Sequence, residues 1–162
     1  MLTILQYPDE RLKLESEPVM SFDAELQQFA RQLEKAMEQG PGAVGIAAPQ
    51  TGHNIRLVIL DVPERKKSTS HGRLFLVNPE ILEWQGMEKG REGCLSVPEY
   101  TGNVIRAKNI VLGAQDLDGN TCQYEMTGYE ARAAQHEIDH LDGFLFLDRL
   151  VSRRNDLYSR QN

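Results

Sequence analysis

Hydrophobic residues recur at helical spacing in two stretches of the chain, and these stretches predict two amphipathic helices. The first follows Ser21, which can act as its N-cap, and stops at Gly40-Pro41-Gly42. Its apolar residues, three or four positions apart, are Leu26, Phe29, Leu33 and Met37. The second follows Thr127 as N-cap and stops at Gly143. Its apolar face is made of Ala131, Ala134, Ile138 and Leu141.

Runs rich in β-branched and aliphatic residues fill the segment between these helices and predict strands. The runs span residues 56–61, 74–78, 81–84, 104–106, 110–115 and 121–126. Asp118-Gly119-Asn120 has the composition of a hairpin turn before the last run. A further short strand is expected at 144–147. The polar tail from Arg149 onward is expected to be flexible, and either frayed or partly helical.

The composition is that of a globular protein with one domain over residues 1–162, long enough to bury its own core. Hydrophobic residues make up 40% of the chain, and no apolar run approaches the roughly 18 residues of a membrane span. The N-terminus lacks the features of a secretion signal, so we expect a cytoplasmic protein without membrane contact. A net charge of −6 argues against nucleic acid and leaves a small neutral ligand or a peptide.

The second helix carries His136 and His140, four residues apart, with Glu137 beside the first. Helical spacing puts both imidazoles on one face, where they can bind the same metal ion, while Glu137 can handle protons there. Tyr129 and Ala133 share the histidine face. The alternative is that both histidines simply lie on the solvent face of an amphipathic helix.

Two cysteines are candidates for a third ligand. Gly93 leaves room beside the sulfur of Cys94, and a thiolate is a good ligand for zinc or ferrous iron. Cys122 lies in an alternating run with Tyr124 and Met126 and is expected to be a buried small hydrophobe. Cys94 is therefore the candidate ligand, with a purely structural role as the alternative.

Residues 42–50 are mostly small and end in the amide of Gln50. Small side chains let an extended peptide approach and pair with this segment as an added strand, although a tightly packed turn explains them equally well. His53 and His71 are expected to face water.

Three segments, GIAAPQ at 45–50, EGCLS at 92–96 and QHEIDHLDG at 135–143, resemble signatures of the peptide deformylases. ILQYPDERL near the start, SVPEY and GYEAR also resemble that family, so the resemblance covers nearly the whole chain in the right order. It implies an α+β fold in which small mixed and antiparallel sheets surround the metal-bearing helix. It implies one divalent metal ion, Fe2+ natively, with Zn2+, Ni2+ or Co2+ as substitutes. The implied substrate is the N-formyl-methionine end of a nascent polypeptide, and the products are formate and a free amino terminus.

Carried onto this chain, the resemblance makes Cys94, His136 and His140 the metal ligands and Glu137 the acid and base. Gln50 and the backbone N–H of Leu95 become the donors to the developing oxyanion. Three protein ligands leave one position for water, whose pKa a divalent metal lowers towards about 7.

The substrate is expected along Val44, Gly45 and Ile46 and near Gly93, with its methionine side chain beside Tyr129 and Ala133. Ala43 departs from the family pattern, which usually has glycine at that position, and its methyl group could narrow the cleft.

Two alternatives to an active deformylase stay open. A zinc peptidase of the HExxH type would need a further ligand downstream, where Asp142, Asp148 and Asp156 are the candidates. A metal-holding relative with little activity would need neither Gln50 nor Glu137, and both are present. The arginines between 149 and 160 leave a weak ribosome contact open, with a solvated tail as the alternative.

Overall fold

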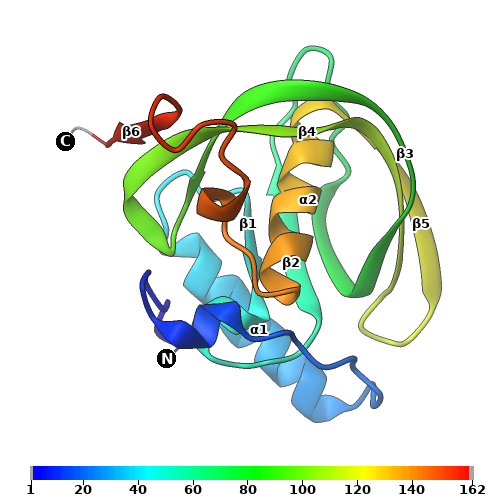
Figure 1. Ribbon diagram of the computed structural model, residues 1–162. Coiled ribbons are helices and arrows are strands. Elements are labelled where there is room, and N and C mark those ends of the chain that lie inside the picture. The colour runs from blue at the N-terminus through cyan, green and yellow to red at the C-terminus, as the bar shows by residue number, and fades with distance from the viewer. Residues whose placement is uncertain (1, 161–162) are drawn as a thin grey trace.

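The structure is a computed structural model and describes residues 2–160 (Figure 1). In chain order the elements are η1 Glu10–Lys13, α1 Ala24–Glu38, β1 Gly45–Ala47, η2 Ala48–Thr51, β2 Leu57–Val62, β3 Gly72–Cys94, β4 Val97–Gln115, β5 Thr121–Thr127, α2 Gly128–Leu141, η3 Phe146–Arg149 and β6 Leu157–Ser159. The named strands form one antiparallel sheet in the order β1-β2-β3-β4-β5, and β6 pairs with the first part of β4. The fold is therefore α+β, as predicted, although the expected small sheets are parts of one curved sheet.

Strands β3 and β4 are much longer than the separate runs predicted for them. The runs 74–78 and 81–84 lie within β3, and the runs 104–106 and 110–115 lie within β4. The pairing of β3 with β4 shifts register between Val77 and Glu80, Ile81 and Glu83, and Glu92 and Cys94. Because such irregularities bend a strand, the sheet curves around α2, as Figure 1 shows.

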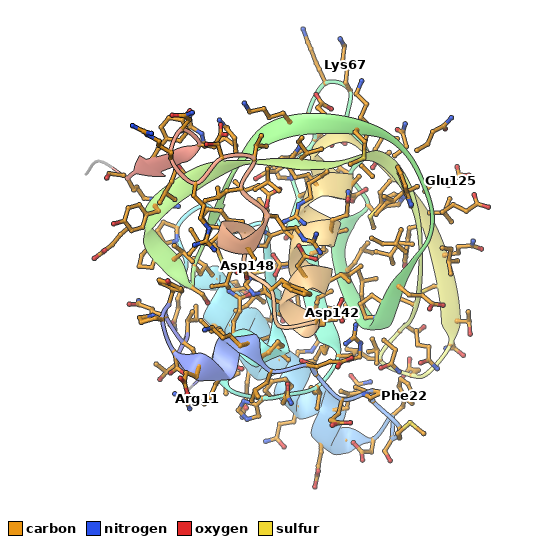
Figure 2. All side chains as sticks on the ribbon, in the orientation of Figure 1. Arg11, Phe22, Lys67, Glu125, Asp142 and Asp148 are labelled. Carbon is orange, nitrogen blue, oxygen red and sulfur yellow. The ribbon has the colours of Figure 1, made fainter. Side chains whose placement is uncertain are left out.

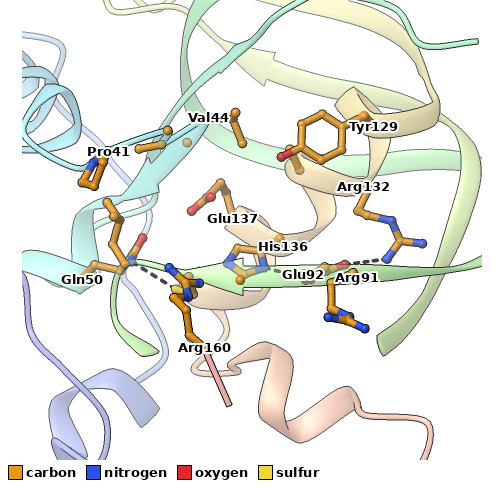
Figure 3. Close-up of a pocket in the computed structure, with 17 residues that line it drawn as sticks. Pro41, Val44, Gln50, Arg91, Glu92, Tyr129, Arg132, His136, Glu137 and Arg160 are labelled. Carbon is orange, nitrogen blue, oxygen red and sulfur yellow. Dashed lines mark hydrogen bonds and ion pairs between the residues drawn. The ribbon is translucent and has the colours of Figure 1, made fainter. Parts of the chain in front are cut away.

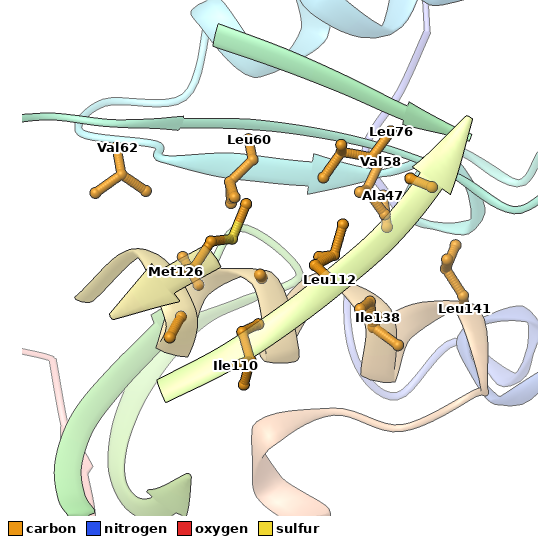
Figure 4. Packing of buried hydrophobic residues seen from close by; sticks show 14 of the residues in the cluster. Ala47, Val58, Leu60, Val62, Leu76, Ile110, Leu112, Met126, Ile138 and Leu141 are labelled. Atoms are coloured by element: carbon orange, nitrogen blue, oxygen red, sulfur yellow. The ribbon is translucent and has the colours of Figure 1, made fainter. Parts of the chain in front are cut away.

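The two faces of β2 anchor the two helices. Side chains alternate along a strand, so Val58, Leu60 and Val62 pack with α2, whereas Leu57 and Ile59 pack with α1. Figure 4 shows the α2 side, where Ile138 and Leu141 lie in one cluster with residues from all five strands β1 to β5. The apolar faces predicted for both helices are therefore confirmed, with Phe29 only half-buried. Charged side chains such as Lys67 and Glu125 project from the surface (Figure 2).

Two local predictions for the helices and the apolar run after α2 were wrong. Asp23 caps α1 in place of Ser21, since its Oδ1 accepts a hydrogen bond from Leu26 N at 3.0 Å. The run 144–147 is not a strand, because Asp148 Oδ2 accepts from Leu145 N at 2.9 Å and the chain turns into η3. The buried side chain of Phe146 packs there in a third cluster with Cys94 and Val104.

The tail is also more ordered than predicted. Its strand β6 pairs with β4 through Tyr100↔Ser159, Thr101↔Tyr158 and Gly102↔Leu157. The buried Asp156 carboxylate accepts from Asn103 Nδ2 at 2.9 Å. No helix in the described part of the chain is long and apolar enough to cross a membrane.

Candidate metal centre

The three predicted ligands converge on one point. His140 Nε2 lies 3.3 Å from His136 Nε2 and 3.3 Å from Cys94 Sγ, and all three ligand atoms lie within 4.8 Å of one another. His136, His140 and Cys94 are only 8%, 1% and 9% exposed. The histidines therefore do not lie on the solvent face of α2.

These distances fit a bound divalent metal. Tetrahedral bonds of about 2.0 to 2.1 Å separate two nitrogen ligands by roughly 3.3 Å, and sulfur and imidazole together suit zinc or ferrous iron. Burial lowers the pKa of His140, with a further contribution from His136, which keeps the ring neutral and able to bind a metal.

The acidic ligands that a zinc peptidase would need are used elsewhere. Asp142 accepts from Arg56 at 2.9 Å, Asp148 caps Leu145, and Asp156 binds Asn103. Within residues 2–160, Cys94, His136 and His140 form the only group that could hold a metal ion.

Glu92 orients His136 and was missed by the sequence reading. Its Oε1 accepts from His136 Nδ1 at 2.9 Å, so Nε2 of that ring is directed towards Cys94 and His140. Arg106 donates to both Glu92 oxygens at 2.9 Å and also to Asp139, while Arg132 donates to Glu92 Oε2 at 2.7 Å. The only sequence signal was its place two residues before Cys94.

Acid should weaken this network. Burial raises the pKa of Glu92, but the hydrogen bonds from Arg106 and His136 outweigh it and hold the pKa far below its usual range. A carboxylate whose pKa is lowered by folding stabilises the protein fully above its unfolded pKa of about 4.3, and this stabilisation declines progressively as the pH falls from there towards the lower pKa of the folded state. In EDTA-treated protein, we expect the free energy of unfolding in urea to fall between about pH 5 and pH 3. The fall should be smaller in Glu92→Gln, and an equal slope in both proteins would contradict the prediction.

Glu137 is buried beside the ligands, and one of its carboxylate oxygens accepts no hydrogen bond. It is 4% exposed, and its Oε1 has no partner within the described chain. Burial raises the pKa of Glu137 to about 7. A carboxyl group with a pKa near neutrality can both take and give a proton, which suits an acid and base.

Gln50 and the backbone N–H of Leu95 are the predicted donors to the oxyanion. Gln50 Oε1 accepts from Ala47 N at 2.9 Å, which directs Nε2 towards Ser96 Oγ at 3.0 Å and Cys94 Sγ at 3.6 Å. The Leu95 N–H has no acceptor among residues 2–160. The Gln50 amide therefore faces the sulfur, and the Leu95 N–H, directly after Cys94 in the chain, is available to a ligand.

A cleft of about 210 Å³ opens above Glu137 and His136 (Figure 3). Its lining includes most of the residues predicted to contact substrate, namely Val44, Gly45, Gly93, Tyr129 and Ala133. Ala43 also lines it. Ile46 does not, because its side chain is fully buried against α1.

The backbone of β1 explains which residue can meet a peptide. Asp61 N donates to Val44 O at 2.8 Å, and Ile46 pairs with Ile59, so both residues bond towards β2. Alternate residues bond to opposite sides of a strand, so the N–H and C=O of Gly45 point to the free edge of the sheet. Gly45 thus offers its backbone to an extended ligand.

Adding a methyl group at Gly45 should disturb Glu137 without reaching the metal ligands. A Cβ there would lie 2.7 Å from Glu137 Oε2, and Gly45 does not have a positive φ, so the effect is purely steric. We expect Gly45→Ala to lower kcat by about 100-fold, since a misplacement near 1 Å can cost that much. Metal content after dialysis should be unchanged, and undiminished turnover would show that the Glu137 position is not critical.

The predictions for three residues outside the cleft, His53, His71 and Cys122, had different outcomes. His71 does not simply face water. Its ring Nδ1 lies 2.6 Å from Oε1 of the fully buried Glu130, and its backbone N–H donates to Glu130 Oε2 at 2.9 Å. His53 is exposed as expected, although its ring lies 4.5 Å from that of Phe29. Cys122 was predicted to be buried but is only partly so, although it packs against the main core as a small apolar residue.

The site combines a three-ligand metal group, a buried carboxyl group of raised pKa and an amide donor at the base of a cleft. These features define a metal-dependent hydrolase of the kind that attacks a carbonyl group. The family model for polypeptide deformylases matches residues 1–156. The chain belongs to this family of metal-dependent enzymes, which remove the N-formyl group from nascent polypeptides.

Individual relatives agree with the family match. A peptide deformylase from Wolinella succinogenes is 44% identical over 93% of this chain and 88% of its own. The crystal structure of a peptide deformylase from Legionella pneumophila superimposes with a TM-score of 0.86 at 38% identity, over 95% of this chain and 89% of that one. A Met-Ala-Ser-bound peptide deformylase from Acinetobacter baumannii has a TM-score of 0.86 at 34% identity, over 93% and 98% of the two chains.

Proposed function

We propose that this chain hydrolyses the formyl amide of N-formyl-methionyl peptides in the cleft between β1 and the end of β3, with Cys94, His136 and His140 as metal ligands. The observation that carries the proposal is the unpaired, buried carboxyl group of Glu137 next to the ligand group and under the free edge of β1. The Acinetobacter enzyme was solved with Met-Ala-Ser, a peptide that begins with methionine, which supports the same class of ligand here.

Each residue of the site has a separate role in the reaction. A divalent metal held by the three ligands would supply a water of lowered pKa and a positive charge beside the formyl oxygen. Glu137 takes the proton of the attacking water and delivers it to the nitrogen of the leaving amine. Gln50 Nε2 and the Leu95 N–H donate to the oxygen on which negative charge develops, and losing one such donor typically costs about 100- to 1000-fold.

The substrate is bound as an added strand. Gly45 pairs with the peptide backbone, Gly93 and Val44 flank it, and Tyr129 with Ala133 forms the wall for the methionine side chain. The methyl group of Ala43 borders the same cleft, so it acts on which substrates fit more than on the chemistry.

Ferrous iron is the metal we propose, with zinc, nickel or cobalt as substitutes. One thiolate and two neutral imidazoles with a divalent ion leave a net charge of about +1, and such a ligand set tolerates ferrous iron. An iron-loaded enzyme with a thiolate ligand should lose activity in air, whereas zinc-loaded or nickel-loaded protein should lose it more slowly.

The direct test is anaerobic formate release from a formyl-Met peptide by iron-loaded protein, with Cys94→Ala as the matched variant. We expect turnover by the wild type, and little metal or activity in the variant after dialysis. Metal binding without formate release would identify an inactive relative, and unchanged metal content in Cys94→Ala would place the third ligand elsewhere.

Formylated nascent chains occur where translation takes place, and for this reason we propose a cytoplasmic location. A weak ribosome contact by the tail would rest on Arg153 and Arg154, which are exposed. Arg149 is already engaged by Asp139 at 2.6 Å, and Arg160 lies at the cleft.

A further inference from the structure

The C-terminal strand brings an arginine to the mouth of the cleft. β6 pairs with β4, and the backbone N–H of Arg160, directly after β6, donates to Glu99 O at 2.8 Å. The Arg160 guanidinium lies over Gly93, where a Cβ would collide with Nη2. Arg160 therefore lines the same cleft as Glu137 and His136, as Figure 3 shows.

A second arginine on the same side is held by the same strand. The Arg91 guanidinium stacks on the ring of Tyr158 at 3.7 Å from its centroid and also lines the cleft. Its hydrogen bonds go to the uncharged oxygens of Asn103 and Thr101, both at 3.4 Å. The pairing of β6 with β4 thus positions Arg160, which directly follows the strand, and Tyr158, on which Arg91 stacks.

Neither positive charge is neutralised within the described chain. Residues 2–160 contain no carboxylate within 4.0 Å of the Arg91 or Arg160 guanidinium, and Arg160 makes no side-chain hydrogen bond there. The third arginine of the lining, Arg132, is paired with Glu92 at 2.7 Å. The cleft carboxylates are Glu92, which is shared by Arg106, Arg132 and His136, and the buried Glu137.

We propose that Arg160, assisted by Arg91, is a specificity-determining residue that favours substrates with an acidic residue soon after the formyl-methionine. The inference rests on the proposed function and deepens it. A peptide paired with Gly45 lies between β1 and Gly93, so its outward side chains face the two guanidinium groups. A carboxylate there gains an ion pair, and an ammonium group is repelled. The net charge of −6 makes such a cationic rim a local feature and not a property of the whole surface.

The test compares kcat/KM for three C-terminally amidated peptides, formyl-Met-Ala-Glu, formyl-Met-Ala-Gln and formyl-Met-Ala-Lys. Amidation leaves the test residue as the only charge that differs. Solvent-accessible ion pairs are individually weak, so attraction of Glu and repulsion of Lys together predict a Glu-to-Lys ratio of about 10 in the wild type. The ratio should fall to about 2 in Arg160→Gln and towards 1 in 1 M salt, where charges are screened.

Matched variants separate charge recognition from a structural role of the tail. Arg160→Lys keeps the charge and should keep most of the preference. Arg154→Gln removes an equal charge from an exposed position in the same segment and should leave the ratio unchanged. The double variant of Arg91→Gln and Arg160→Gln should show a ratio near 1.

The outcomes are distinct. If Arg160→Gln lowers kcat/KM by the same factor for all three peptides, Arg160 only positions the tail and the proposal is overturned. A wild-type ratio near 1 at low salt also overturns it. If the wild type releases no formate from any peptide, including the neutral one, the proposed function has failed and not the assignment of Arg160.

Discussion

Glu137→Gln is expected to lower kcat/KM for formyl-Met peptides by about 1000-fold while the protein keeps its metal, since general acid and base groups typically contribute about 100- to 10,000-fold. Glutamine has the same shape but cannot exchange a proton at neutral pH. Glu137 is buried with one oxygen unpaired, so its replacement by a neutral amide leaves no buried charge behind. The measurements are formate release, metal stoichiometry after dialysis and the midpoint of thermal unfolding.

An exposed glutamate serves as the control for this variant. Glu125→Gln on β5 changes the net charge equally but lies on the surface, and its activity should equal that of the wild type. Near-normal turnover in Glu137→Gln would assign proton transfer to another group. A parallel loss of metal would mean that Glu137 supports the ligands instead.

Arg106→Met should lower the free energy of unfolding by about 3 to 5 kcal/mol, which is the usual cost of removing one partner from a buried charge network. Arg106 is 4% exposed and donates to Glu92 and Asp139, both of which are also buried. Methionine fills much of the same volume but leaves the two carboxylates short of donors. Urea unfolding gives the free energy directly.

The same variant should also weaken metal binding, because Glu92 orients His136. Arg11→Met is the control, since the Arg11 side chain is 60% exposed and solvent screens its pair with Asp9, so its loss should change the stability little. A loss of stability in Arg106→Met no larger than in this control would show that the buried network is not a major source of stability.

The ligand group could be predicted from sequence because its parts lie in short, local patterns. His136 and His140 occupy one face of a helix by spacing alone, and Gly93 beside Cys94 marked that cysteine as the third ligand before the family resemblance agreed. The network behind the ligands had no such signal. Arg106 reaches Glu92 because β3 and β4 pair with Arg106 opposite Glu88, and this register depends on bulges in a long hairpin.

The errors of the sequence reading share a physical cause. The predicted run 81–84 ends at Trp84, yet β3 continues to Cys94 because β4 pairs with it along most of its length. The tail looked frayed because its order comes from pairing with residues 100–102, far away in the chain. Contacts between distant segments decided each case, and local composition does not encode them.

An open strand edge is normally a hazard, because strands of other molecules can add to it and begin aggregation. The edge of β1 is only three residues long and faces a cleft whose other wall includes Gly93 and Arg160. Such a narrow slot in the surface accepts a single extended polypeptide chain but not a hairpin or a sheet. The timing of processing follows, because a newly made chain must reach this slot before its first residues fold into a structure of their own.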